Sequence, residues 1–309
     1  MAPEDNFLYN KEEFLSTIEN ATTRSIASSV LRQCAPYEEK YNTPLCEMSL
    51  DMLQDIFSNS FGNKLKSMMD AKKFVKKFFK WQYEVYGVKD TGEIDNVKLD
   101  SVGKMRKSMV SSPLHLSKVM DAIFHPVEKN TQHNAYRSLL WLVYMGFTFA
   151  EAVEITFDEV DFDSMTVSHG NKKIEIYHEA YEVFKRTKKA KEFVVDLKRN
   201  SKKARQMQDN YFVCGISKSK MSLTTLSSML AVAQQDLETE ITVKSIEYSG
   251  IFFRTFEIER ATRQIDFVEA ARLENTLVYD PENPGDFKRK LRELNAKYRA
   301  DYETWKRAF

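Results

Sequence analysis

The sequence predicts a mainly α-helical protein with one small antiparallel sheet, organised as two domains. Apolar residues recur at helical spacings of three and four through most of the 309 residues. One stretch, residues 165–177, instead alternates around Gly170-Asn171, the pattern of a β-hairpin with a two-residue turn. The chain is about twice the length of a typical single domain, so we expect two domains.

The first domain, residues 1–87, is expected to be entirely helical. Asn10 with Glu13 has the pattern of a capping box, and Pro36 should end the second helix. Ser49 is placed to cap the third helix, and Gly87 to end the fourth. The expected helices span residues 10–21, 25–35, 49–57 and 64–86.

Residues 88–113 lose the apolar period and gain Gly, Ser, Asp and Lys, which is typical of a linker. The second domain, residues 114–309, is expected to contain helices on both sides of the hairpin in sequence. The predicted helices span residues 116–124, 132–145, 178–188, 222–236 and 250–261, and a short strand is predicted over residues 211–214.

A last helix, predicted over residues 286–309, carries an amphipathic stripe. Two interpretations are open: the stripe packs on its own domain, or it docks on a neighbouring protomer and mediates self-association. The stripe consists of Phe287, Leu291, Leu294, Tyr298, Tyr302, Trp305 and Phe309.

Composition excludes several classes of protein. No apolar run approaches the roughly 18 residues of a membrane-spanning helix, and the acidic N-terminus is unlike a signal peptide. The three cysteines, Cys34, Cys46 and Cys214, form no CxxC pair and indicate neither a disulfide framework nor a zinc site. We therefore expect a cytosolic protein that uses no metal or nucleotide cofactor.

The formal net charge of +1 conceals a basic cluster between residues 64 and 80, which contains seven lysines and one acid. On a helix, Lys72, Lys76 and Lys80 recur at a spacing of four and form one ridge, with Lys73 and Lys77 beside it. Such a ridge is suited to contact phosphates or to enter a major groove.

Two further basic segments accompany this cluster. Residues 185–205 contain ten Lys or Arg against two acids, whereas residues 139–171 contain six acids and no Lys or Arg. The linker contributes Lys104, Arg106 and Lys107. A single patch is usually a solvated face, but three of them, one in the linker, predict a polyanion held between the two domains.

Residues 145–162 resemble the first box of phage integrases and other tyrosine recombinases. The positions that fit are Gly146, Phe147, Glu151, Ile155, Phe157, Val160 and Asp161, and the acidic position of the box is Glu159. Residues 244–248 and 268–279 best match the second and third boxes. The resemblance implies a helical, SAM-like core-binding domain followed by a catalytic-type α domain with a small antiparallel sheet.

In that family, two arginines and two histidines act on the scissile phosphate together with a hairpin lysine and a nucleophilic tyrosine. The arginine positions hold Thr148 and Glu247 here, the histidine positions hold Lys244 and Ala270, and the lysine and tyrosine correspond to Lys172 and Tyr279. All five histidines precede residue 179, so none can fill the later boxes. A carboxylate at 247 would repel a phosphate. The resemblance thus implies a fold that binds DNA without performing the chemistry.

We therefore expect a non-enzymatic, sequence-specific double-stranded DNA-binding protein: a transcriptional repressor that maintains phage lysogeny in a bacterial host cell. Its partner would be an operator in the nucleoid, and a protein antagonist would release it. Two alternatives stay open, an accessory module of an active integrase and a divergent active recombinase that uses Tyr279. The residues expected to contact DNA are Lys72, Lys73, Lys76, Lys77, Lys80, Lys104, Arg106, Lys107, Lys172 and Arg254.

Overall fold

The computed structural model divides the chain into two compact units. The first covers Met1–Met105 with Ala308, and the second covers Arg106–Arg307 with Phe309. The boundary falls inside the segment for which the sequence predicts a linker. The structure describes residues 3–62, 65–88, 92–124, 131–189, 192–195, 203–206, 210–213, 220–273, 277 and 284–309.

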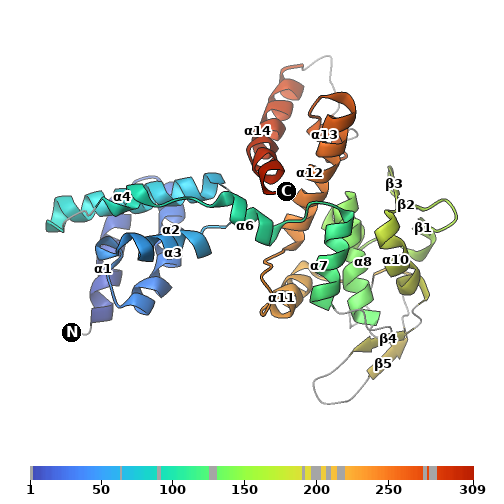
Figure 1. The fold of residues 1–309 in the computed structure, drawn as a ribbon, viewed down its shortest axis with the longest axis horizontal. Coiled ribbons are helices and arrows are strands. Elements are labelled where there is room, and N and C mark those ends of the chain that lie inside the picture. Colours follow the sequence, from blue (N-terminus) through green and yellow to red (C-terminus); the bar gives the residue numbers. More distant parts are fainter. Residues whose placement is uncertain are drawn as a thin grey trace. The chain divides into compact units, whose positions relative to one another are not determined.

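The first unit is built from helices (Figure 1). Its main helices are α1 (Pro3–Ser16), α2 (Ala21–Tyr41), α3 (Leu50–Asn59) and α4 (Leu65–Tyr86), with a 3₁₀ turn, η1 (Leu45–Glu47), before α3. The Ser49 hydroxyl accepts a hydrogen bond from the Met52 amide and caps α3. Gly87 follows α4 with a φ of 68°, as a glycine that ends a helix does. These two predicted helix ends are confirmed.

Both ends of the first two predicted helices are wrong, and the break between them lies between Ser16 and Ala21, earlier than predicted. The first helix starts at Pro3, so Asn10 lies inside α1 and does not cap it. The second helix runs through Pro36 and ends at Asn42, whose φ is 47°. An interior proline costs roughly 3 kcal/mol, but Pro36 is exposed and both sides of it are anchored, by Leu31 and Cys34 before it and by Glu38 after it. Burial on both sides outweighs the local cost.

A buried ion pair lies in this unit. Lys11 of α1 and Glu38 of α2 are 6% and 4% exposed, and the Lys11 ammonium donates to the Glu38 carboxylate. The other oxygen of Glu38 accepts the Leu45 amide hydrogen at 3.0 Å. The pair thereby joins α1, α2 and η1.

The predicted linker is more structured than its composition suggests. It contains α5 (Glu93–Asn96) and α6 (Ser101–Ser108). Ile94 and Val97 are buried in the core of the first unit. The Gln54 side chain donates to the Lys98 carbonyl and accepts from the Lys98 amide, both at 2.8 Å. Isolated apolar residues anchor this segment, and a periodicity search does not detect them.

The second unit is organised around α8 (Thr131–Met145), which is buried at every residue from Asn134 to Met145. Its elements in chain order are α7 (Pro113–Phe124), α8, α9 (Phe149–Ala152), a 3₁₀ turn η2 (Phe157–Glu159), the strands β1 (Val160–Asp161), β2 (Thr166–His169) and β3 (Lys172–Glu175), α10 (His178–Lys189), β4 (Glu192–Val195), β5 (Lys203–Gln206), α11 (Leu223–Ala233), α12 (Val243–Thr262), α13 (Phe267–Ala270) and α14 (Pro284–Ala308). Helices α10 and α12 contact α8 most extensively. The predicted fold class, mainly helical with a small antiparallel sheet, is confirmed.

The antiparallel sheet has the strand order β1-β2-β3. Strands β2 and β3 form the predicted hairpin, with His169 opposite Lys172 and Gly170 at a φ of 57° in the turn. A second antiparallel pair, β4–β5, is not predicted, because neither the three adjacent apolar residues of β4 nor the polar sequence of β5 alternates. Of the strand predicted over 211–214, Tyr211 forms an isolated bridge with Thr156, and Cys214 lies outside the described residues.

The C-terminal helix α14 packs on its own unit. Tyr298, Tyr302 and Trp305 are at most 3% exposed, and the Trp305 indole donates to the Val110 carbonyl at 3.0 Å. The second half of the predicted stripe therefore covers α12 and α13 through ring contacts. Phe287, Leu291 and Leu294 are only partly buried. Among the described helices, none is long and apolar enough to cross a membrane.

We predict that Glu38→Ala lowers the free energy of unfolding of the first unit by about 3–5 kcal/mol, because it leaves Lys11 charged and buried without its partner. Urea unfolding read by hydrogen exchange of α2 peptides measures this. Glu39→Ala, at the exposed neighbouring position, is the matched control and should change stability by less than about 0.5 kcal/mol. Equal losses in both variants would show that the pair is not a stabilising element.

Candidate nucleic-acid interface

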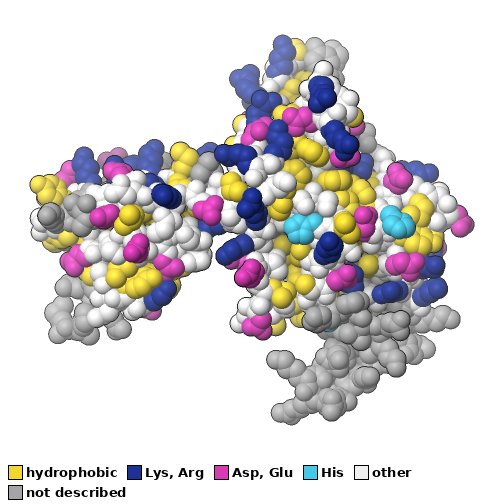
Figure 2. Space-filling view, in the orientation of Figure 1, with side chains coloured by type: hydrophobic (Ala, Val, Ile, Leu, Met, Phe, Trp, Pro, Cys, Tyr) yellow, Lys and Arg dark blue, Asp and Glu magenta, His cyan; other side chains and the backbone are white. Residues whose placement is uncertain are grey.

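Four lysines share the solvent-facing side of α4. Lys66, Lys73, Lys77 and Lys80 follow one another at spacings of seven, four and three, which places them on one helix face. All four are exposed, and Met69 (55%) and Tyr83 (59%), seven residues before and after Lys76, are exposed at the edge of this face. Figure 2 shows Lys and Arg side chains gathered along the side of the first unit where α4 lies. We call Lys66, Lys73, Lys77 and Lys80 the α4 outer face.

The predicted ridge of Lys72, Lys76 and Lys80 is divided by the fold. Lys72 turns towards α5 and donates to the carbonyls of Asp95 and Val97 at 3.0 and 2.9 Å. Lys76 pairs with the Asp95 carboxylate at 2.8 and 2.7 Å. Lys76 and Lys80 both keep exposed side chains (54% and 74%), and Lys80 lies 3.5 Å from Glu84. The sequence does not reveal this division, because α5 is not predicted and its position beside α4 is a tertiary contact.

The three linker cations lie on α6. The Lys104 ammonium donates to the Ser60 carbonyl and is partly buried. Arg106 and Lys107 are exposed. The Lys107 backbone carbonyl accepts from Thr239 and Glu240, which ties this end of α6 to the second unit.

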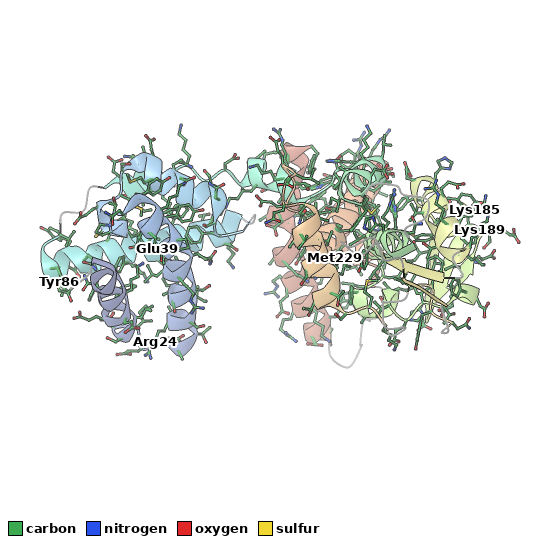
Figure 3. All side chains as sticks on the ribbon, turned by 90° about the horizontal axis from the view of Figure 1, so that it is seen from below. Arg24, Glu39, Tyr86, Lys185, Lys189 and Met229 are labelled. Carbon is green, nitrogen blue, oxygen red and sulfur yellow. The ribbon has the colours of Figure 1, made fainter. Side chains whose placement is uncertain are left out.

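The second basic stretch begins on α10. Lys185 and Lys189 project from this helix away from the body of the second unit (Figure 3). Lys188 instead donates to the Val160 carbonyl at 3.1 Å and lies over the Phe162 ring, so it holds β1. Residues 190–191 and 196–202 of this stretch lie outside the described residues.

The end of α8 is the centre of the candidate site in the second unit. Helix α8 ends in a Schellman motif, in which the Phe147 amide donates to Leu142 and the Gly146 amide to Val143, with Gly146 at a φ of 118°. This motif satisfies two of the terminal carbonyls and leaves those of residues 144, 145 and 146 without intrahelical partners.

Three cations from three elements bind these three carbonyls. Arg254 of α12 donates to Tyr144 at 2.5 Å, Arg272 after α13 donates to Met145 at 3.0 Å, and Lys172 of β3 donates to Gly146 at 3.3 Å. Cations at a helix C-terminus also interact favourably with the helix dipole. We call Arg254, Arg272 and Lys172 the α8 cation cap.

Thr148, at the position of the family's first arginine, has a local structural role. Its hydroxyl caps α9 by accepting the Glu151 amide at 3.2 Å, and its own amide donates to Glu151 Oε2 at 2.6 Å. The same oxygen accepts from Lys172 Nζ at 2.7 Å. The hydrogen bonds from Lys172 and Thr148 outweigh partial burial and lower the pKa of Glu151. The structure therefore brings Thr148 and Lys172 together through Glu151.

A cavity of 630 Å³ lies beside Arg254 and Arg272, and Ala270 lines it. Burial lowers the pKa of Arg254 to about 10, and the neighbouring positive charge of Arg272 contributes in the same direction. Arg254 also donates to the Ala270 carbonyl at 2.7 Å, and its buried Nη2 has no hydrogen-bond partner among the described residues.

Three carboxylates also line the cavity: Glu179, Glu257 and Glu269. Within the described part of the chain, none of them forms an ion pair. A phosphate in this cavity would meet two arginines that already bind carbonyls and three carboxylates that repel it.

The two residues matched to the second box contact each other. Lys244 and Glu247 pair with each other at 2.8 and 2.9 Å, one turn apart near the start of α12. Glu247 does not line the cavity, whereas Arg254, two turns later, does. Arg254 and not Glu247 therefore shares the site with Ala270. Tyr279 lies outside the described residues.

The sequence analysis does not identify three features of the two candidate surfaces. Arg272 lies in no recognised motif position, and only the fold brings it to the end of α8. Lys66 was counted in the basic cluster but not selected. The cavity carboxylates come from α10, α12 and α13, so no spacing rule links them.

One family match covers part of the chain. Residues 8–84 match the family described as "MrpR, N-terminal core-binding domain", which supports the core-binding prediction for the first domain. No curated protein matches the sequence.

Similar solved structures include three recombinases. They are the Tn1549 transposon integrase in complex with circular intermediate DNA (11% identity, 91% of this chain and 94% of that chain, TM-score 0.38), XerA recombinase (11%, 95% and 98%, TM-score 0.37), and the integrase from mycobacterium phage Brujita (12%, 96% and 90%, TM-score 0.37).

We predict that Gly146→Ala destabilises the second unit by about 1–3 kcal/mol. A Cβ at this position would lie 2.7 Å from Arg272 Cδ, and the backbone would keep a φ that disfavours L side chains. Urea unfolding read by hydrogen exchange of α8 peptides measures the loss. Gly170→Ala is the control, because it also places a side chain at a positive φ (57°) but its Cβ would meet nothing within 4 Å, so the difference between the two variants reports the contact with Arg272. A loss no larger than that of Gly170→Ala would contradict the cation-cap geometry.

Proposed function

We propose that this chain is a non-enzymatic, sequence-specific double-stranded DNA-binding protein that acts as a transcriptional repressor and maintains phage lysogeny. Affinity comes from lysines that contact phosphates, and specificity comes from a smaller number of groove contacts. No metal or nucleotide takes part.

The observation that carries DNA binding is the α4 outer face. Its four lysines are exposed and lie inside the segment that matches a core-binding family. Met69 and Tyr83 add exposed apolar surface at the edge of this face. A helix with cations flanking exposed apolar side chains is suited to dock in a major groove, where backbone contacts position the protein and base contacts specify the sequence.

The α8 cation cap supports a binding role without catalysis. Phosphoryl-transfer catalysis needs cations directed at developing charge on phosphate oxygens. Arg254, Arg272 and Lys172 instead donate to carbonyls of α8, and three carboxylates share the cavity. Thr148 caps α9 and offers no cation.

The repressor role is the finer part of the proposal. It rests on the sequence resemblance of this chain to a recombinase with altered boxes, a pattern similar to that of the integrase-like master repressor of the lytic cycle in SPβ-like Bacillus phages. Repression would follow when the bound protein excludes RNA polymerase from an operator, and a protein antagonist would relieve it.

A second candidate function is an accessory module that joins an intact integrase through α14. The partly buried Phe287, Leu291 and Leu294 in the first half of that helix favour this alternative. This alternative predicts that the protein alone binds DNA weakly and that it forms a stable complex with a recombinase. A third candidate is an active recombinase. It predicts a covalent protein–DNA adduct on a nicked substrate, and this adduct should be absent in Tyr279→Phe.

We predict that purified protein recovers a shared short sequence from a library of random duplex fragments. Sequencing of the bound fragments is the measurement. Fragments without a common site would count against a repressor, and no recovered DNA would shift the weight to the accessory module.

We predict that Lys73→Gln/Lys77→Gln weakens binding to the recovered site on the order of tenfold and reduces the slope of log K against log salt by about 1.8, because two phosphate contacts are lost. Fluorescence anisotropy over a salt series measures both. Lys72→Gln/Lys76→Gln removes the same charge from the side of α4 that faces α5 and should have the smaller effect. The reverse order would mean that the α5-facing lysines leave Asp95 to contact DNA.

A further inference from the structure

Lys172 is held back from solvent in this structure. It is the first residue of β3, directly after the hairpin turn, yet its side chain is only 21% exposed. Its ammonium donates to Glu151 Oε2 at 2.7 Å and to the Gly146 carbonyl at 3.3 Å, and it lies 5.9 Å from the centre of the Phe147 ring. Two of its three donor hydrogens are thus directed at the protein.

Glu151 is itself fixed in position. Its Oε2 accepts the Thr148 amide at 2.6 Å, and its amide donates to the Thr148 hydroxyl at 3.2 Å, which together form the capping box of α9. The carboxylate can therefore follow a moving Lys172 only if α9 loses its cap. A phosphate that binds Lys172 must therefore draw its ammonium away from the Glu151 carboxylate, which the α9 cap holds in place.

The neighbouring ion pair of Glu154 and Lys220 provides a contrast. It is 2.6 Å long, but its side chains are 52% and 44% exposed, and Glu154 does not cap a helix. Water screens such an exposed pair and leaves its members free to separate. The Glu151–Lys172 pair is the one built into the fold.

We propose that Glu151 is a specificity-determining residue that withholds the charge of Lys172 from DNA of arbitrary sequence. This inference rests on the proposed DNA binding. Phosphates of any duplex attract a free lysine equally, so an uncompensated Lys172 would strengthen nonspecific and specific binding alike. With Glu151 in place, Lys172 contributes to binding affinity only where the other contacts hold a phosphate close enough to draw the ammonium away from the carboxylate. Discrimination between operator and random DNA therefore increases.

The test uses the full chain and a random-sequence duplex beside the recovered operator. Glu151→Gln keeps an oxygen that can cap α9 and removes the charge. We expect it to bind the random duplex roughly threefold to fivefold more tightly than the unaltered chain, with a salt slope steeper by about 0.9, so that the ratio of operator to random affinity falls.

Two further variants distinguish the release of Lys172 by Glu151→Gln from a general loss of negative charge. In Glu151→Gln/Lys172→Gln the gain on random DNA should disappear, because the released lysine is absent. Glu154→Gln removes an equal charge three residues away and should leave random-duplex affinity unchanged. Thermal melting by circular dichroism checks that all three variants fold.

The outcomes are distinct. If the unaltered chain binds DNA and Glu151→Gln does not tighten random binding, or if the gain persists in the double variant, the role of Glu151 is overturned and DNA binding stands. If the unaltered chain binds neither duplex, the proposed function fails and the inference fails with it.

Discussion

The structure of the second unit depends on how the carboxyl end of α8 is satisfied. This helix is buried along most of its length, so its last carbonyls cannot all bind water, and an unpaired buried carbonyl is costly. A glycine with positive φ closes the Schellman motif, and Arg254, Arg272 and Lys172 bind the three remaining carbonyls. Because these cations come from α12, the turn after α13 and β3, one helix end fixes three otherwise separate elements.

This arrangement has a functional consequence, because a cation bound to a carbonyl has fewer donors left for a phosphate. In the second unit, the cations nearest the cavity serve the fold, and the cavity is completed by Glu179, Glu257 and Glu269. In the first unit the same division separates α4 into an α5-facing side, where Lys72 and Lys76 hold α5, and an outer face that stays exposed. The lysines that contact α5 thus differ from those of the outer face of the same helix.

Two carboxylates reduce the positive charge at lysines that the sequence predicts to contact DNA: Glu151, which is partly buried, and Asp95, which is 57% exposed. Asp95 and Glu151 each bind a lysine that the sequence assigns to DNA. A phosphate that approaches must exchange with them, and the free energy of association is reduced by the attraction it replaces. A basic patch counted from sequence therefore overstates the charge that a folded protein presents.

Local sequence patterns determined several helix ends and one turn of this protein. Ser49, Gly87 and Gly170-Asn171 specify a helix start, a helix end and a hairpin turn through backbone geometry within a few residues, and the structure has all three. The prediction that Pro36 ends the second helix was wrong. The proline destabilises the helix locally, but burial of Leu31, Cys34 and Glu38 on its two sides outweighs that cost. Only the tertiary structure decided which cations are available, because Lys72 meets α5, Lys172 meets α9, and Arg254 and Arg272 meet α8 across distances in sequence that no spacing rule spans. Hydrogen-bond partners of long side chains are set by packing, and packing is a property of the whole fold.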